Sequence, residues 1–239
     1  YSNVKNNYTG TVHFSSTDLA AVLPNDYQFI GGDAGVHTFT AGVSFRTPGS
    51  QSVTASDTGV SASQTGITVN PGSLDHFTVT GITSPINAGA TSDVVVTAYD
   101  AYSNIKTNYT GTIHFTSSDA SAVLPNDYQF QGSDSGVHTF TTGVSMRTVG
   151  SQSVAAADSA ITGSQTGITV NAGSLDHFTV TGITNPIAAG ATSDVIVTAY
   201  DSYSNVKNNY TGTVHFSSTD LAAVLPTDYP FQGGRAGVH

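Results

Sequence analysis

The chain has 239 residues and a formal net charge of −10 at pH 7, because it contains 16 acidic residues and only 6 lysines and arginines. Such a surface repels phosphate backbones and anionic membranes, which argues against nucleic acid as a partner and against membrane insertion of this segment. There is no cysteine, which excludes disulfides and thiolate metal sites. Charged residues make up 9% of the chain and hydrophobic ones 38%, with small and polar types dominating the rest, a composition typical of an extracellular β-protein.

One stretch, residues 99–115, organises the chain, because nearly the same residues recur at 1–14 and 200–216. The tyrosines that open its Tyr-Ser-Asn triplets are spaced 101 residues apart, at Tyr1, Tyr102 and Tyr203. A period of that length predicts tandem domains and not a solenoid of short units. The sequence therefore predicts a complete module and two partial ones: 1–72 without its first two strands, 73–173 complete, and 174–239 without its last strands.

The complete copy predicts seven short strands. They are expected at residues 74–80, 92–99, 110–116, around 128–130, 137–144, 152–157 and ending at 167–170. Alternate residues of these stretches are apolar, and Gly, Pro, Asn and Asp separate them. Seven such strands in about 100 residues are typical of an immunoglobulin-like antiparallel β-sandwich. The expected fold class is thus all-β, with tandem Ig-like modules that repeat every 101 residues.

Differences between the copies indicate which positions face the core. Three apolar residues are replaced by other apolar residues 101 positions later: Val4 by Ile105, Val12 by Ile113 and Phe45 by Met146. We therefore expect these six side chains to point inward.

The segments that join the predicted modules are very short. Asn70-Pro71-Gly72 and Asn171-Ala172-Gly173 lead directly from the last strand of one copy into the Ser-Leu-Asp-His-Phe of the next. A connection of this length cannot behave as a flexible coil. We therefore expect successive modules to stack end to end as a semi-rigid rod.

A signature accompanies each copy. The stretch Val96-Thr97-Ala98-Tyr99-Asp100-Ala101-Tyr102-Ser103-Asn104, followed by Thr110-Gly111-Thr112-Ile113-His114-Phe115, resembles the V-x-A-x-D-x-x-G-N pattern of bacterial Ig-like repeats of the invasin and intimin type. Ser103 stands where that pattern usually has glycine. The resemblance extends over all three copies. It implies a stalk-like module of a large secreted or surface-attached protein, which in some members is an adhesin.

Aspartate is abundant and glutamate is absent, and Ca²⁺ prefers clustered carboxylate and carbonyl oxygens. The candidate calcium ligands are Asp100 with Asn104, Asp158 or its counterpart Asp57 after the sixth strand, and Asp176 or its counterpart Asp75 near the connections between copies. Calcium is the candidate cofactor. Because Asp is also an ordinary turn residue, and because no loop has the dense D-x-D-x-D-G spacing, plain hydrogen-bonded turns are the alternative.

Two features suggest carbohydrate. Asn7, Asn108 and Asn209 each open an Asn-Tyr-Thr triplet, the acceptor for N-glycosylation, although copying a repeat also copies a chance motif. Tyr102 and Tyr109, with Asp100 nearby, are a candidate aromatic platform for a sugar, and the alternative is ordinary sheet surface.

No catalytic residue is expected. The eight histidines recur singly at repeat positions, and no nucleophile, base and orienting group stand at a suggestive spacing. The expected function is therefore structural: an extracellular or cell-surface module that forms a semi-rigid stalk or filament with neighbouring modules. The alternative is an adhesin-type module that binds a glycan or a cell-surface receptor.

Chains of this kind have a further way to associate. The two partial modules contain every strand between them, so other copies of the same chain could complete them by strand complementation and build a head-to-tail fibre. The alternative is that the sequence is a window on a much longer chain of repeats. No apolar run approaches the roughly 18 to 20 residues that span a bilayer, and no signal sequence opens the chain. Any export signal or anchor is expected outside this segment.

Overall fold

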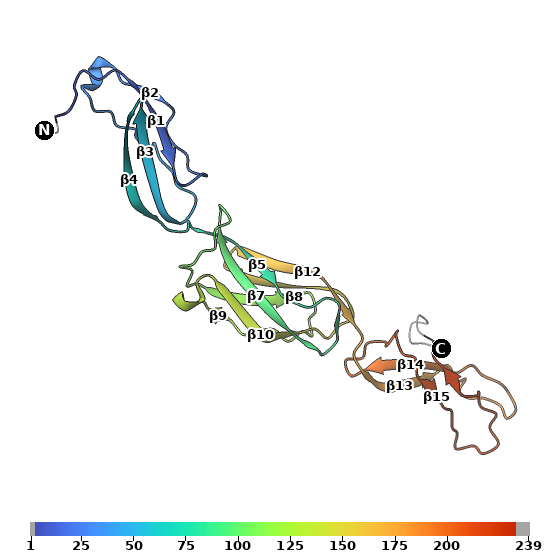
Figure 1. Cartoon of the computed structure of the whole chain (residues 1–239). Coiled ribbons are helices and arrows are strands. Elements are labelled where there is room, and N and C mark those ends of the chain that lie inside the picture. Colours follow the sequence, from blue (N-terminus) through green and yellow to red (C-terminus); the bar gives the residue numbers. More distant parts are fainter. Residues whose placement is uncertain (1–2, 233–239) are drawn as a thin grey trace. The chain divides into compact units, whose positions relative to one another are not determined.

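The computed structural model describes residues 3–232, and these are all-β apart from two single-turn 3-10 helices, η1 (Gly31–Asp33) and η2 (Gly132–Asp134). No helix within this range is long and apolar enough to cross a membrane. The described residues divide into two compact units, one made of residues 3–76, 97–111 and 130–137, the other of residues 77–96, 112–129 and 138–232. Figure 1 gives the strands in sequence colours.

The first strands form one sheet in the order β2-β1-β3-β4. They are β1 (Thr11–Ser16), β2 (Tyr27–Gln28), β3 (Gly49–Asp57) and β4 (Val60–Val69). All three pairings are antiparallel, and β3 and β4 make a long hairpin from Gly49 to Val69. The last strands are β13 (Leu175–Thr181) paired with β14 (Ile196–Asp201), and β15 (Thr213–Val214) paired with β16 (Tyr229–Pro230).

The strands between these form two sheets, in the orders β10-β7-β5 and β6-β12-β11-β8-β9 (Figure 1). Their bounds are β5 (Leu74–Thr80), β6 (Ile86–Asn87), β7 (Thr91–Asp100), β8 (Thr112–Ser117), β9 (Tyr128–Gln129), β10 (Val137–Ser145), β11 (Gly150–Asp158) and β12 (Ile161–Asn171). Strands that follow one another in the sequence, such as β7 and β8, lie in different sheets, as in an immunoglobulin-like sandwich. The short β9 lies on one edge of the larger sheet.

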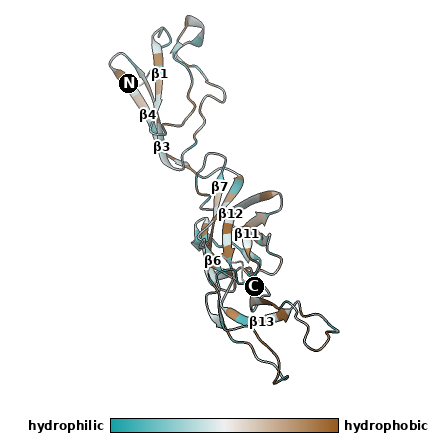
Figure 2. Ribbon diagram, turned by 90° about the vertical axis from the view of Figure 1, so that its right-hand side faces the viewer, coloured by the Kyte–Doolittle hydropathy of each residue, from teal (hydrophilic) through white to brown (hydrophobic). Residues whose placement is uncertain are grey.

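A single apolar core lies between the two sheets. The smaller sheet contributes Phe77, Val79, Val94, Val96 and Val144, and the larger one contributes Ile113, Phe115, Val154, Ala156, Ile168 and Val170, all of them buried. Phe115 of β8 meets Phe140 of β10 edge to face at 4.9 Å between ring centres, which joins the two layers. Figure 2 shows apolar and polar residues interchanging along strands such as β7 and β12, as one-sided burial requires. The all-β antiparallel fold expected from the sequence is confirmed.

The strands differ from the predicted ones in two places. β6 was not expected, because two residues cannot show a period; it exists through its pairing with β12. β12 begins at Ile161, several residues before the predicted seventh strand, since the polar stretch around Gly163 is held by antiparallel pairing with β11. A Cβ atom at Gly163 would overlap the carbonyl of Phe77, so a glycine is required where β12 passes β5.

The inward assignment was wrong for one pair of residues. Ile113 and Met146 are fully buried, but Ile105 is 40% exposed and Val4 is 64% exposed. Ile105 follows the turn after β7 and pairs with Tyr99 in an isolated bridge. The side chain of Ile105 lies against Gly136, because a Cβ atom added to Gly136 would be 2.9 Å from it. Ile105 therefore covers a loop and does not enter the core.

Candidate functional site

The residues with the most elaborate polar contacts surround the short connection at Gly72. The turn that follows β7 is built on Asp100, whose side chain is 1% exposed. Its Oδ1 accepts the main-chain N–H groups of Tyr102 and Asn104, both at 2.9 Å. Ser103 has a φ of 63°, in the left-handed region that favours glycine. The turn of the resembled pattern is thus present here, with serine in the position that usually holds glycine.

The same turn fixes both peptide groups of the connection. Asp100 Oδ2 accepts the N–H of Gly72 at 2.8 Å and the side-chain amide of Asn104 at 2.9 Å. Lys106 donates its Nζ to the carbonyl of Gly72 at 2.7 Å. A glycine is the residue with the most backbone freedom, and here a carboxylate and an ammonium group remove that freedom.

The turn also contacts the loop that precedes β3. Asn104 donates Nδ2 to the carbonyl of Arg46 at 2.7 Å, and the guanidinium carbon of Arg46 lies 5.3 Å from the ring centre of Tyr102. That distance is within the range of a cation–π interaction. We refer to Arg46, Gly72, Asp100, Tyr102, Asn104 and Lys106 as the first joint.

A second buried carboxylate, that of Asp18, holds the loop that contains Arg46. Asp18 is 2% exposed and accepts the N–H groups of Arg46 and Thr47 at 2.7 and 2.9 Å, and the hydroxyl of Thr47 at 2.7 Å. Burial by itself would raise the pKa of Asp18, but these hydrogen bonds outweigh it and lower the pKa to about 2. The loop that presents Arg46 is therefore anchored on an ionised carboxylate.

The same contacts recur around Gly173, which defines the second joint as Arg147, Gly173, Asp201, Tyr203, Asn205 and Lys207. Asp201 accepts the N–H of Gly173 at 2.8 Å, and Lys207 donates to the Gly173 carbonyl at 2.7 Å. Asn205 donates to the carbonyl of Arg147 at 2.7 Å, and the Arg147 guanidinium carbon lies 5.3 Å from the Tyr203 ring centre. Asp119 holds the Arg147 loop as Asp18 holds that of Arg46.

Three further buried carboxylates, two in the joints and one beside the second joint, share the electrostatics of Asp18. Burial alone would raise the pKa of Asp100, Asp119 and Asp201. Each pKa nevertheless lies below its ordinary value, because hydrogen-bond donors surround the charged carboxylate and outweigh the effect of burial. For Asp100 and Asp201 the strongest donor is the side-chain amide of the asparagine four residues later. Each joint thus contains one ionised aspartate, and a second one, Asp18 or Asp119, holds the loop of its arginine.

One difference between the two joints lies two residues after the arginine. Val149 donates its main-chain N–H to Asn205 Oδ1 at 3.2 Å. The residue 101 positions earlier is Pro48, which has no N–H to donate. The second joint therefore has a hydrogen bond that Pro48 prevents in the first.

The predicted calcium ligands lie in different places. Asp100 and Asn104 are brought together, whereas Asp158 ends β11 and Asp176 lies in β13, where it contacts His177 Nδ1 at 2.8 Å. No group of three or more His, Asp or Glu side chains in residues 3–232 has a metal-binding arrangement. Both oxygens of Asp100 already accept N–H donors, which is the hydrogen-bonded turn that the sequence offered as the alternative. Calcium binding at any of these residues stays a prediction.

The glycosylation candidates Asn7, Asn108 and Asn209 are all exposed. Asn108 and Asn209 accept hydrogen bonds from the lysines of the joints, Lys106 at 3.1 Å and Lys207 at 3.0 Å. Attachment of a glycan to them stays a prediction.

The aromatic sugar platform expected from Tyr102 and Tyr109 is wrong. Tyr109 is only 5% exposed and packs on Phe130, with 5.0 Å between ring centres, while Asp100 faces the turn that it stabilises. Tyr102 alone is well exposed, at 51%, and its ring already contacts Arg46. These side chains therefore do not form one surface.

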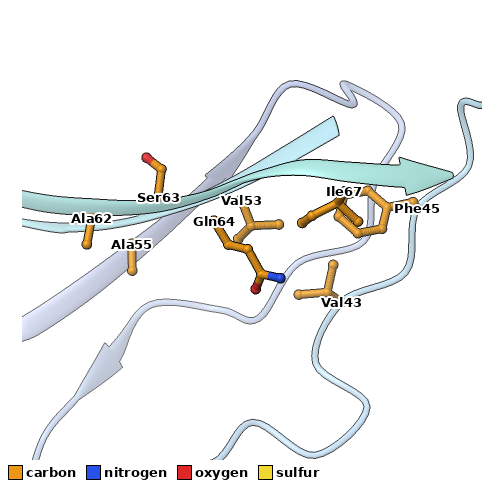
Figure 3. Close-up of a pocket in the computed structure, with 8 residues that line it drawn as sticks. All are labelled: Val43, Phe45, Val53, Ala55, Ala62, Ser63, Gln64 and Ile67. Carbon is orange, nitrogen blue, oxygen red and sulfur yellow. The ribbon is translucent and has the colours of Figure 1, made fainter. Parts of the chain in front are cut away.

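An open apolar hollow of about 470 Å³ lies against β3 and β4, where Figure 3 shows the side chains of Val43, Phe45 and Ile67 converging. Their counterparts 101 residues later, Val144, Met146 and Ile168, are fully buried in the sandwich core. The hollow therefore corresponds to a surface that β5 and β7 cover in the sandwich of residues 73–173. Its lining is core-like and has no charged group, so it does not indicate a ligand site.

No protein-family model matches the sequence, and a comparison with curated proteins also gives no match. Solved structures with a related arrangement of strands include FdeC, an Escherichia coli adhesin, at 17% identity and a TM-score of 0.46 over 82% of this chain. Yersinia pseudotuberculosis InvD matches 89% of this chain at 20% identity with a TM-score of 0.40. Domains 4–9 of the surface layer protein SbsC match 91% at 18% identity with a TM-score of 0.32. The chain spans 65% of the length of the first two and 32% of the third.

Proposed function

We propose that the chain is a structural, non-catalytic segment of an extracellular or cell-surface protein, in which consecutive modules are held as a semi-rigid stalk. The observation that carries the proposal is the capture of Gly72 by Asp100 and Lys106, at the only short connection between the copies 1–72 and 73–173. The repetition of this capture at Gly173 adds to it. The polar, weakly charged composition agrees with a location outside the cell.

The contacts of one joint are strong enough to restrict bending. A hydrogen bond to a charged group contributes about 1.5–3 kcal/mol, a neutral one about 1 kcal/mol and an exposed cation–π pair about 0.5–1 kcal/mol. The first joint contains all three kinds, at Asp100, Asn104 and Arg46. Even after the cost of ordering the side chains, a joint of this kind is expected to stay closed for most of the time.

Residual dipolar couplings of the full chain test this proposal. If the first joint is semi-rigid, the amides of β1–β4 and of β5–β12 report one common alignment tensor. The double variant Arg46→Ala/Asn104→Ala should give two different tensors. The control is Asn126→Ala, which changes an exposed turn residue of the sandwich and should leave the common tensor intact. Two independent tensors in the unaltered chain would contradict the stalk.

Calcium is a second, separable part of the proposal. If Ca²⁺ contributes to the joints, adding it to the metal-free chain should raise the melting temperature, and Asp100→Asn or Asp176→Asn should reduce that increase. Filaments of the native material that collapse in chelator would agree with this role. A melting temperature that calcium leaves unchanged would remove calcium from the account and leave the hydrogen-bonded joint.

The alternative function is adhesin-type binding of a glycan or a surface receptor. The feature that favours it is the exposed pair of Arg46 and Tyr102, since arginine and tyrosine are enriched in binding interfaces. A glycan array and a cell-binding assay with the folded chain test it. Binding that Tyr102→Ala abolishes, without loss of folding, would favour an adhesin over a scaffold.

Association of copies by strand complementation stays a prediction for the 239-residue chain. It would bring the face of β13 and β14, where Val180 is 58% exposed, onto the hollow of β3 and β4 in another copy. In the sandwich the counterpart Val79 is 2% exposed, which shows how such faces pack when covered. Sedimentation velocity tests it: oligomers that disappear when residues 174–200 are deleted would support complementation, and a monomer at all concentrations would contradict it.

A further inference from the structure

The short strand β6, which follows the first strand β5 of the sandwich, is bound along the last strand, β12. β6 pairs with β12 in parallel, with Ile86 opposite Val170 and Asn87 opposite Asn171. The N–H of Ala88 donates to the carbonyl of Asn171 at 2.8 Å, which extends the pairing by one residue. Residues 86–88, near the start of residues 73–173, are therefore joined directly to the last strand.

Side chains continue this attachment on the other side of β6. Gln165 accepts the N–H of Ile82 at 3.0 Å and donates to the carbonyl of Ile82 at 2.7 Å. Its side-chain amide therefore makes the two hydrogen bonds that the backbone of a neighbouring strand would otherwise make. Ser84 Oγ accepts the N–H of Thr169 at 3.0 Å. Ile82 and Ile86 are buried. Residues 82–88 are thus held on β12 by backbone pairing, by a bidentate amide and by core packing.

The direction of the two strands determines how this attachment responds to tension. In a stalk under load, force enters residues 73–173 at their first residue, reaches β6 through β5, and leaves at their last residue. Because β6 and β12 run in the same direction, the two forces slide one strand along the other. The hydrogen bonds between them lie across the line of force and share the load, whereas a hairpin pulled at its open end loses its bonds one pair at a time.

We propose that the contacts of residues 82–88 with β12 form a force clamp, which makes the sandwich resist stretching between its ends. The inference rests on the proposed stalk function, because only a load-bearing module has use for such a clamp. The clamp gives Gln165 a role in resisting mechanical force through its two hydrogen bonds with Ile82. Gln64 occupies the corresponding position on β4.

Single-molecule stretching of the full chain in two directions tests the clamp. The chain has no cysteine, so handles can be attached at introduced ones. Ser73→Cys with Ser174→Cys loads the sandwich end to end, and Ser151→Cys with Thr169→Cys pulls apart two residues that face each other in the β11–β12 hairpin. The clamp predicts a clearly higher unfolding force for the first pair of handles than for the second. Equal forces in the two directions would overturn it.

A matched pair of variants identifies the contacts responsible. Gln165→Ala removes two hydrogen bonds to Ile82 and should raise the end-to-end unfolding rate at a given force by about tenfold, equivalent to about 1.4 kcal/mol. Ser117→Ala removes the hydrogen bond to the carbonyl of Ser153, the one from the N–H of Asp119 and a weak one to Met146 Sδ at 4.0 Å, but it lies outside the clamp. It should lower equilibrium stability and leave the end-to-end rate unchanged.

The outcomes separate the clamp from the stalk. If Gln165→Ala and Ser117→Ala change the end-to-end rate equally, or Gln165→Ala does not change it, the clamp is wrong. The common alignment tensor across the first joint is measured without force and does not depend on Gln165. A rigid joint with a mechanically weak sandwich would therefore retain the proposed stalk and discard the clamp, and independent modules would discard the stalk itself.

Discussion

The side-chain amide of Asn104 donates a hydrogen bond to the main-chain carbonyl of Arg46, 2.7 Å away and 58 residues earlier in the sequence. The same amide nitrogen also reaches Asp100 Oδ2 at 2.9 Å. One asparagine therefore connects the buried carboxylate of its own turn with the loop of the preceding copy. Asn205 makes the corresponding bonds to Arg147 and Asp201, at 2.7 and 2.8 Å.

Replacing this amide by a carboxylate should break the joint. Asn104→Asp puts an acceptor where both Arg46 and Asp100 require a donor, and adds a negative charge beside an ionised aspartate. We expect a loss of roughly 2 kcal/mol or more in the free energy of unfolding, measured by urea denaturation. Asn126→Asp adds the same charge in an exposed turn and should cost less than about 0.5 kcal/mol. Equal effects of the two variants would contradict the role given to Asn104.

The ring of Tyr102 is expected to matter and its hydroxyl is not. Tyr102→Phe keeps an aromatic face for the Arg46 guanidinium, so the two copies should keep their common alignment. Tyr102→Ala removes that face and should weaken the joint by about 0.5–1 kcal/mol, which broadens the distribution of alignments in the dipolar couplings. If phenylalanine weakened the joint as much as alanine, a hydroxyl contact and not the ring would be responsible.

Acid should release the turns of both joints. The folded-state pKa values of Asp100, Asp119 and Asp201 lie below the ordinary value of about 3.9, and that of Asp18 is about 2. A lowered folded pKa stabilises the fold fully above the unfolded pKa, and this contribution is lost as the pH falls through the folded one. Urea midpoints should therefore be constant above about pH 5 and fall steeply between about pH 4 and about pH 2.

Asp100→Asn separates this effect from the titration of surface carboxylates. The amide cannot carry the charge that Gly72, Tyr102 and Asn104 now solvate, so the variant should be less stable at neutral pH. Its stability should also fall less between about pH 4 and about pH 2, since one group with a lowered pKa is gone. An acid profile parallel to that of the unaltered chain would show that Asp100 does not contribute to the acid response.

Much of the sandwich could be predicted because its strands carry their own pattern. β5 was predicted with its observed bounds, since Phe77 and Val79 alternate with polar residues between turn residues. β6 and the first half of β12 could not be predicted in this way. Ile86 and Asn87 are too few to show a period, and the stretch around Gly163 is polar on a strand that its neighbour holds in place. Such segments form strands because of their pairing partners, which are the distant β12 for Ile86 and Asn87 and the preceding strand β11 for the stretch around Gly163.

The site was predicted in part and for a different chemistry. Asp100 and Asn104 were singled out as calcium ligands because their oxygens cluster, and the structure surrounds Asp100 with N–H donors. Asp18 was missed, although an aspartate recurs there in all three copies, as Asp119 and Asp220. The pairing of Arg46 with Tyr102 could not be inferred from any local pattern, because it joins two loops from different copies.

Ser103 offers a stabilising substitution. Its φ of 63° is strained for a residue with a Cβ atom, so Ser103→Gly should raise the free energy of unfolding by about 1 kcal/mol. Ser151→Gly, in the regular strand β11, should instead lower it by about 0.5–1 kcal/mol, because glycine has more freedom to lose there. The two variants thus change thermal stability in opposite directions. The same sign for both would mean that the turn after β7 tolerates serine without strain.

The exchange of Pro48 for Val149 between the joints predicts which of them bends more easily. Val149 donates its N–H to Asn205 Oδ1 at 3.2 Å, and Pro48 cannot make the corresponding bond to Asn104. Pro48→Val should therefore add a hydrogen bond worth about 0.5–1.5 kcal/mol to the first joint, and Val149→Pro should remove one from the second. Dipolar couplings of the full chain should show less motion at Gly72 in the first variant and more motion at Gly173 in the other. If proline and valine can be exchanged at both positions without any change, the side-chain oxygen of Asn205 has no part in the stiffness of the second joint.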